Sequence, residues 1–128
     1  MPFIEHYFPK VPIIELVYGE IECQELVSVI VALLQNKDNV VVISSDLSHF
    51  YPLKEANKHD NACLSALSTL DIEALHKGCE ACGFMGIEAM MEASKELEFE
   101  SKLLDYRTSA DASGDETSVV GYLSAMFY

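Results

Sequence analysis

The stretch VVVISSDLSHF, residues Val40–Phe50, decides the fold of this chain. Its first residues are mostly β-branched, and apolar and polar side chains do not alternate along them. Such a run is typical of a strand that is covered on both faces, as the central strands of parallel sheets are. The stretch therefore predicts a buried central strand over Val40–Ser45, followed by a polar and aromatic loop.

The residues before this strand predict a strand and a helix in sequence. The run Val11–Tyr18 is rich in apolar residues and is closed by Gly19, which indicates a first strand. Apolar residues then recur at helical spacing, which predicts a helix over about Glu22–Gln35. A strand, a helix and a second strand in this order indicate an α/β domain, and we expect a layered α/β/α fold with a mostly parallel central sheet.

The residues after the loop continue the alternation of helices and strands. The expected helices cover Lys54–Leu70, Ile72–Lys77 with Asp71 as its cap, and a segment that starts at Gly83 and turns Ile87, Met90, Met91, Ser94 and Leu97 inward. The expected strands are Phe99–Tyr106 and Ser118–Phe127, separated by an acidic loop over Ser109–Glu116. That loop lacks the alternating ligands of an EF-hand, so we interpret it as a solvated turn. No linker or repeat divides the chain, which indicates a single domain over residues 1–128.

Composition excludes two kinds of partner. The 128 residues include 8 Lys and Arg against 21 Asp and Glu, for a net charge of -13. Nucleic acids and anionic membranes are bound through clustered basic residues, whereas the basic residues here are scattered singly. No apolar stretch approaches the length of a membrane-spanning helix, and the first residues do not resemble a secretion signal. We therefore expect a soluble cytoplasmic protein.

Four cysteines are too few for a disulfide scaffold, and we expect thiols or metal ligands. Cys79 and Cys82 form a C-x-x-C motif before Gly83, where a helix is expected to begin. A helix N-terminus lowers the pKa of a thiol, so Cys82 is the better candidate for a reactive or metal-bound thiolate. A single C-x-x-C between two helices is weak support for redox chemistry, and a zinc ribbon needs a second pair. Cys23 and Cys63 are expected to be buried and inert.

Asp46 and His49 follow the strongest predicted strand. In open α/β sheets, ligands bind beyond the carboxyl ends of the strands. An Asp and a His three residues apart can bind a metal there, or form an acid–base pair in which the carboxylate orients the imidazole. The alternative is structural: Asp46 caps the turn, and His49 packs against Phe50 and Tyr51. The remaining histidines, which are His6, His59 and His76, are expected to be surface or packing residues.

Several motifs together resemble the C-terminal half of the Memo family, whose bacterial and archaeal members are called AmmeMemoRadiSam system protein B. Memo proteins are structurally similar to class III extradiol dioxygenases of the LigB type, which are non-heme iron enzymes with an α/β core. The resemblance therefore implies a LigB-like fold and iron or another divalent metal as the cofactor. The matching residues are Val40–Phe50, Asp60, Glu80–Gly83, Leu103–Ser109 and Val119–Tyr122.

The resemblance also assigns candidate site residues. It implies that Asp46, His49 and Cys82 line the family's metal-site cleft, with Cys82 opposite the other two at the start of a helix. Ser45, Cys79 and Gly83 adjoin these three and are further candidates.

The sequence departs from the family in two respects. The family's glycine-rich segment and cleft histidines would precede Met1, and His6 does not correspond to one of those histidines. Phe84–Ile87 stands where the family usually has an Arg and a Pro, which changes the expected anion binding and loop shape.

These departures bear on function. A non-heme iron site commonly needs two histidines and a carboxylate, whereas the candidates here include one histidine. We therefore expect a Memo-like protein with a residual metal-site cleft and no complete catalytic site on this chain. Three alternatives remain: an interaction module that self-associates or docks a partner over an exposed sheet edge and the Met90–Met91 face; an iron-dependent, dioxygenase-like enzyme completed by another chain; and a thiol redox protein that uses Cys79 and Cys82.

Overall fold

The computed structural model describes residues 2–128 and confirms the α/β class. None of the described helices is both long enough and apolar enough to cross a membrane. The helices are α1 (Pro2–Tyr7), α2 (Cys23–Leu34), α3 (Leu53–Thr69), α4 (Ile72–His76), α5 (Phe84–Glu96) and α6 (Ala110–Ser113). The strands are β1 (His49–Tyr51), β2 (Ser101–Thr108) and β3 (Val119–Phe127).

The sheet is antiparallel, so the prediction of a mostly parallel sheet is wrong. Its order is β1-β3-β2, and both neighbouring pairs run in opposite directions. In the longer pair, Ser101 lies opposite Phe127 and Thr108 opposite Gly121. β2 and β3 are joined by a short connection that contains α6, and strands linked so closely pair as an antiparallel hairpin.

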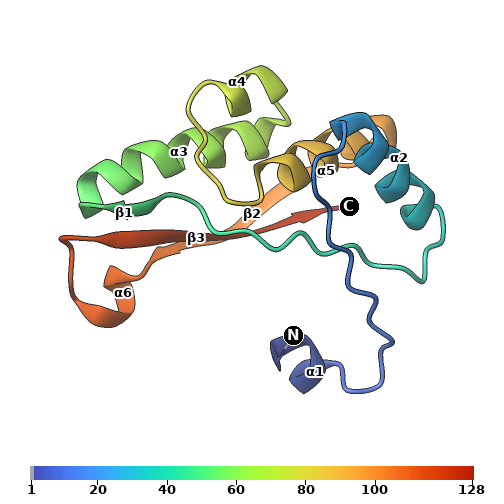
Figure 1. Cartoon of the computed structure of the whole chain (residues 1–128), viewed down its shortest axis with the longest axis horizontal. Helices are drawn as coiled ribbons and strands as arrows, with labels where there is room; N and C mark the ends of the chain where they lie inside the picture. The colour runs from blue at the N-terminus through green and yellow to red at the C-terminus, as the bar shows by residue number, and fades with distance from the viewer. Residues whose placement is uncertain (1) are drawn as a thin grey trace.

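The longer helices lie on one side of this sheet (Figure 1). α3 packs across β2 and β3, α4 follows it, and α2 packs against α5. The described residues thus form two layers, where three were predicted. The predicted helices and the cap are confirmed, and the Asp71 carboxylate accepts the Ala74 N–H at 3.0 Å.

The core consists of two apolar clusters. One joins α3, α4 and α5 with the loop before β1, and it includes Leu47, Cys63 and Met91. The other lies between α2 and α5 around Val27 and Met90. The inward face predicted for the helix after Gly83 is confirmed for four residues, while Leu97 is half-buried. Burial of each large aliphatic side chain contributes about 2 kcal/mol, which accounts for the regularity of these helices.

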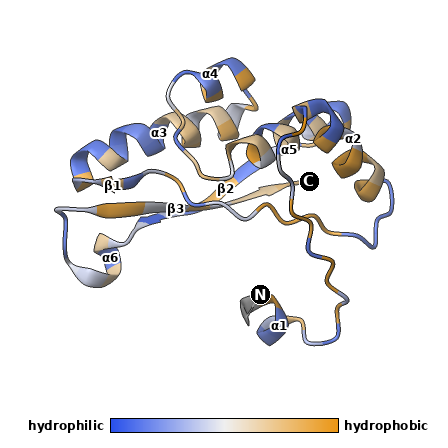
Figure 2. Cartoon of the chain, viewed as in Figure 1, coloured by the Kyte–Doolittle hydropathy of each residue, from blue (hydrophilic) through white to orange (hydrophobic). Residues whose placement is uncertain are grey.

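The two strands predicted in the first half of the chain are absent from the described structure. Val11–Tyr18 and Val40–Ser45 have no strand partner, and Figure 2 shows hydrophobic residues along both segments. Val17 is 96% exposed and Val40 is 84% exposed. A β-branched run becomes a strand only where a neighbouring strand accepts its backbone hydrogen bonds, and residues 2–128 place no such neighbour beside these two segments.

Candidate functional site

A β-bulge shapes the start of the candidate site. His49 pairs with Val120 and Tyr51 with Val119, so Phe50 is an extra residue in β1. Phe50 has a φ of 64°, a left-handed conformation that is strained for a residue other than glycine. Bulges and strained residues of this kind are frequent next to functional sites, where they redirect neighbouring side chains.

The three residues assigned by the resemblance lie together. The Asp46 Oδ2 and His49 Nε2 atoms are 3.6 Å apart. The Asp46 backbone N–H donates to the Cys82 sulfur at 3.2 Å, and the Cys82 N–H donates to the Asp46 carbonyl at 3.2 Å. The His49 ring also lies 5.7 Å from that of Phe50, so the packing contact expected in the structural alternative is present as well.

Ser45 and Gly83 link the loop that carries Asp46 to the start of α5. The Gly83 N–H donates to the Ser45 hydroxyl oxygen at 2.8 Å, and that hydroxyl donates to the Asp46 carbonyl at 2.8 Å. The Ser45 oxygen and the Cys82 sulfur are 3.7 Å apart. A Cβ atom on residue 83 would lie 2.7 Å from the Ser45 Cβ, so the close approach of the loop to α5 requires glycine.

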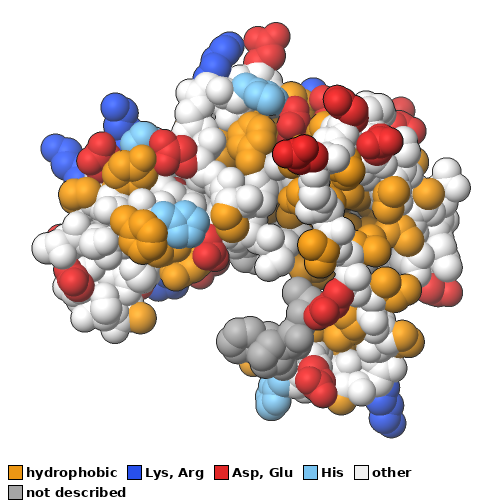
Figure 3. Space-filling view, viewed as in Figure 1, with side chains coloured by type: hydrophobic (Ala, Val, Ile, Leu, Met, Phe, Trp, Pro, Cys, Tyr) orange, Lys and Arg blue, Asp and Glu red, His pale blue; other side chains and the backbone are white. Residues whose placement is uncertain are grey.

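Of the candidate residues, His49, Cys79 and Cys82 line a shallow hollow of about 390 Å³. Figure 3 shows histidine, apolar and acidic side chains side by side over the region of β1 and α3, with Lys and Arg placed singly at the margin of this face. The residues that line the hollow are Leu47, Ser48, His49, Cys79, Glu80, Ala81, Cys82 and Phe84.

Cys79 forms a disulfide with Cys63, which corrects two predictions. Cys79 and Cys82 are not a dithiol pair, and the buried Cys63 is not a free thiol. The pairing arises because α3 lies beside the loop before α5, which brings the two Cα atoms to 4.5 Å. Cys82 remains free and exposed, and Cys23 is free and half-buried. Burial, followed by the charges of nearby glutamates, raises the pKa of Cys23 to about 11.

A second group of polar side chains beside the hollow was not predicted from the sequence. His59 Nδ1 lies 3.3 Å from the Glu80 Oε1 atom, and the His59 ring stacks on that of Tyr51 at 4.7 Å. The pKa of Tyr51 is raised because Glu80 accepts its hydrogen bond and its negative charge opposes that of the phenolate. Histidine and glutamate come from different segments that only the fold brings together, so their spacing in the sequence gave no signal.

Asp60 anchors the loop that carries Asp46 and His49. Its carboxylate is fully buried, with an exposed fraction of 0%. One oxygen accepts the Ser48 N–H at 3.0 Å, and the other accepts the Tyr106 hydroxyl at 2.6 Å. Burial, followed by this hydrogen bond and the charge of Asp60, raises the pKa of Tyr106. From the sequence, Asp60 is only one of the residues that match the Memo family, with no predicted role.

Gly121 holds the same loop from β3. Its carbonyl accepts the Leu47 N–H at 2.9 Å, and its N–H donates to the Ser48 carbonyl at 3.0 Å. The loop is therefore bound on one side by the β3 backbone and on the other by the Asp60 carboxylate.

The candidate side chains, taken among the described residues, do not make a complete metal site. Asp46 and His49 are close enough to share an ion, but the Cys82 sulfur already accepts the Asp46 N–H. Among residues 2–128, no three His, Cys, Asp or Glu side chains converge on one point that could hold a metal ion. A non-heme iron centre with two histidines and a carboxylate does not fit this set.

Comparison with known proteins places the chain in a family. Residues 1–126 match the Memo family, described as Memo-like protein, and the chain belongs to that family. A MEMO1 family protein of Sulfurisphaera tokodaii is 33% identical over 139 residues, which cover 99% of this chain and 49% of that relative.

Other relatives agree. A MEMO1 family protein of Aquifex aeolicus is 31% identical over 99% of this chain and 51% of its own length. One from Desulfurococcus amylolyticus is 37% identical over 70% of this chain and 33% of its own length. The chain thus spans about half the length of the curated relatives that match nearly all of it.

Proposed function

We propose that this chain forms one wall of a Memo-type cleft and that it is not a complete catalytic centre by itself. The contacts of Asp46 with both His49 and Cys82, two residues that line the hollow, carry this proposal. These side chains supply a carboxylate, an imidazole and a thiol, which suit a divalent metal or a polar ligand. A working dioxygenase-like site needs at least one further histidine from residues outside this set.

The anchoring of the loop supports a role in ligand binding. Asp46 and His49 lie on a short segment whose backbone is bound by Asp60 and Gly121, so their side chains are held in place before a ligand arrives. Buried carboxylates and strained residues such as Phe50 are costly, and folds retain them where a fixed geometry is useful.

Metal analysis and a catechol-cleavage assay on the same purified protein test the proposal. After loading with Fe²⁺ under nitrogen, we expect less than one iron per chain, and no ring-opened product when catechol and dioxygen are then added. Replacing His49 with Ala should reduce any weak binding, whereas replacing His76 should not, because His76 is paired with Glu88 away from the Asp46–His49 pair. One iron per chain together with ring-opening activity would refute the proposal.

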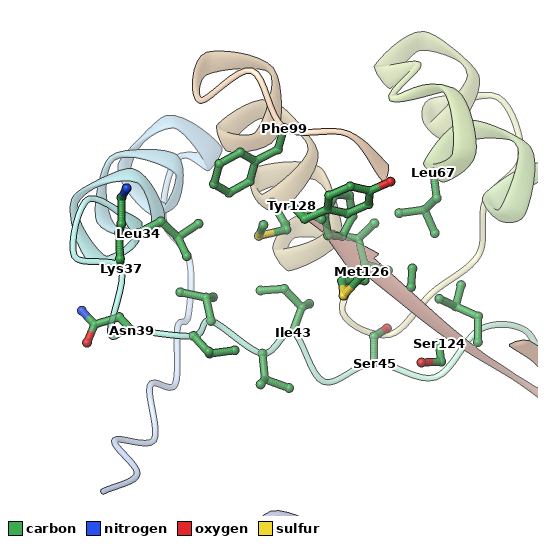
Figure 4. Close-up of a pocket in the computed structure, with 18 of the residues that line it drawn as sticks. Leu34, Lys37, Asn39, Ile43, Ser45, Leu67, Phe99, Ser124, Met126 and Tyr128 are labelled. Atoms are coloured by element: carbon green, nitrogen blue, oxygen red, sulfur yellow. The ribbon is translucent and has the colours of Figure 1, made fainter. Parts of the chain in front are cut away.

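A second candidate function is that of an interaction module, and a groove favours it. An apolar groove of about 710 Å³ runs between Val40–Ile43 and the end of β3 (Figure 4). Side chains of α3 and α5, including Leu67 and Met90, form its floor. Both walls are extended segments with unpaired backbone groups on the side that faces the groove. An extended segment of another chain can add a strand there and cover the apolar surface.

We propose a second copy of the chain as the partner, and light scattering after size-exclusion chromatography tests this. The expected result is a dimer or larger species that dissociates when Val42, in the groove, is replaced with Lys. The matched control is Val29→Lys, which changes an exposed valine on α2. A wild-type protein that is monomeric in this measurement would refute self-association and leave a different chain as the partner.

A further inference from the structure

We propose that Cys82 is an exchange thiol for the buried disulfide between Cys63 and Cys79. Three of the four cysteines lie in or beside the shallow hollow. Cys63 and Cys79 are bonded, while Cys82 is free and lies three residues beyond Cys79. Cys79 and Cys82 both line the 390 Å³ hollow. A C-x-x-C spacing is the one that thiol–disulfide exchange motifs use.

An exposed exchange thiol is useful because the Cys63–Cys79 disulfide is buried. Cys63 is 0% exposed and Cys79 is 9% exposed, so both bonded residues are largely shielded from a dissolved thiol. Cys82 is exposed on the same hollow. A reagent that meets this surface therefore reaches Cys82 more readily than it reaches the disulfide.

The surroundings of Cys82 hold its sulfur at the rim. The Asp46 N–H donates to the sulfur at 3.2 Å, and the Ser45 hydroxyl oxygen is 3.7 Å from it. Both contacts come from the loop that Asp60 and Gly121 anchor. The sulfur is thus held at this loop, and Cys79 is only three residues away along the chain, which lowers the entropic cost of bringing the two sulfurs together.

The exchange is balanced within the protein. The Cys82 thiolate attacks the Cys79 sulfur, a Cys79–Cys82 bond forms, and the Cys63–Cys79 bond breaks. Cys63 leaves as a thiolate and takes up a proton from solvent, which replaces the proton that Cys82 gave up. No electron is gained or lost. Because Cys63 lies among Leu47 and Leu75 in the core, its thiolate is poorly solvated, so the Cys63–Cys79 bond is the resting form.

Exchange gives the disulfide a path to reduction. The Cys79–Cys82 bond would lie at the exposed rim, where a low-molecular-weight thiol can reduce it. Without Cys82, the same reagent has to attack the buried pair directly. This inference does not depend on metal binding or on a partner chain.

Reduction of the folded protein by dithiothreitol tests the inference. Samples of wild type, Cys82→Ser and the control Cys23→Ser are quenched with acid at intervals, alkylated and digested with trypsin. Cys63 lies on the tryptic peptide 59–77, while Cys79 and Cys82 both lie on peptide 78–95. The resting disulfide therefore links two peptides, whereas the exchanged disulfide lies within one peptide and leaves Cys63 alkylated.

We expect wild type and Cys23→Ser to be reduced about tenfold faster than Cys82→Ser, because an intramolecular thiol acts at a high effective concentration. Early wild-type samples should contain peptide 78–95 with an internal disulfide. In guanidinium chloride the variants should react at similar rates, since burial no longer protects the bond. Equal rates in the folded proteins, or no trapped internal disulfide in the wild type, would overturn the inference.

Discussion

The Asp60 carboxylate lies directly against the Cα atom of Gly121, and a Cβ atom on residue 121 would overlap it. The Gly121→Ala variant should therefore lose about 2–4 kcal/mol of unfolding free energy, because the methyl group displaces a buried carboxylate from its donors. Urea denaturation measures the loss. Gly19→Ala is the control, since a Cβ atom there meets nothing within 4 Å, and a similar loss in both variants would contradict the prediction.

The hydrogen bond between Tyr106 and Asp60 should be one of the strongest polar contacts in the protein. Tyr106→Phe removes the hydroxyl and leaves a buried carboxylate oxygen without that donor, at an expected cost of about 2–3 kcal/mol. Tyr122→Phe is the matched control, because Tyr122 lies exposed on the neighbouring strand. Chemical denaturation with equal midpoints for the two variants would show that the contact is unimportant.

The Ser45 hydroxyl should hold the loop to the start of α5. In Ser45→Ala, the buried Gly83 N–H loses its acceptor, so we expect a loss of about 1–2 kcal/mol. The alkylation rate of Cys82 should also change, because Ser45 is 3.7 Å from its sulfur. Ser44→Ala, at the exposed neighbouring position, should change neither quantity. An unchanged alkylation rate in a folded Ser45→Ala protein would show that the Ser45 hydroxyl does not influence the Cys82 thiol.

Stability should fall at alkaline pH because of Cys23. Its pKa is raised from 9.0 to about 11 in the folded protein, so the unfolded chain releases the proton first as pH rises. The contribution of Cys23 to stability is therefore complete below pH 9 and decreases up to about pH 11. Tyr106, whose pKa is raised as well, acts in the same direction. Denaturation midpoints across this range should decline less steeply in Cys23→Ser, and identical slopes would contradict the assignment.

The sequence predicted helices α2 to α5, whose stability is largely local, and did not predict the short helices α1 and α6, the second of which lies in the segment predicted to be a solvated turn. The predicted helices carry their own apolar stripes, and α4 carries its own cap, so their patterns were sufficient. β2 and β3 were also found because they form a hairpin across a short connection. The predictions of strands over Val11–Tyr18 and Val40–Ser45 were wrong, because a strand depends on a neighbouring strand, which no local pattern specifies.

The candidate site was predicted in the same uneven way. The structure places Asp46 beside both His49 and Cys82, while the assignment of these residues to a metal-site cleft stays a prediction. The Cys63–Cys79 disulfide and the contacts of Asp60 join segments that are distant in sequence, so residue spacing could not reveal them.

The exposed apolar segments have a consequence for handling the protein in solution. Val17 and Val40 present β-branched surface that can adhere to other protein molecules. Electrostatic repulsion between molecules that each carry a net charge of -13 opposes this adhesion. Salt screens this repulsion, and acid removes it near the isoelectric point of about 4.4. Colloidal stability should therefore be greatest in dilute neutral buffer. It should be lowest in concentrated salt or near the isoelectric point, where little electrostatic repulsion prevents the exposed apolar segments from associating.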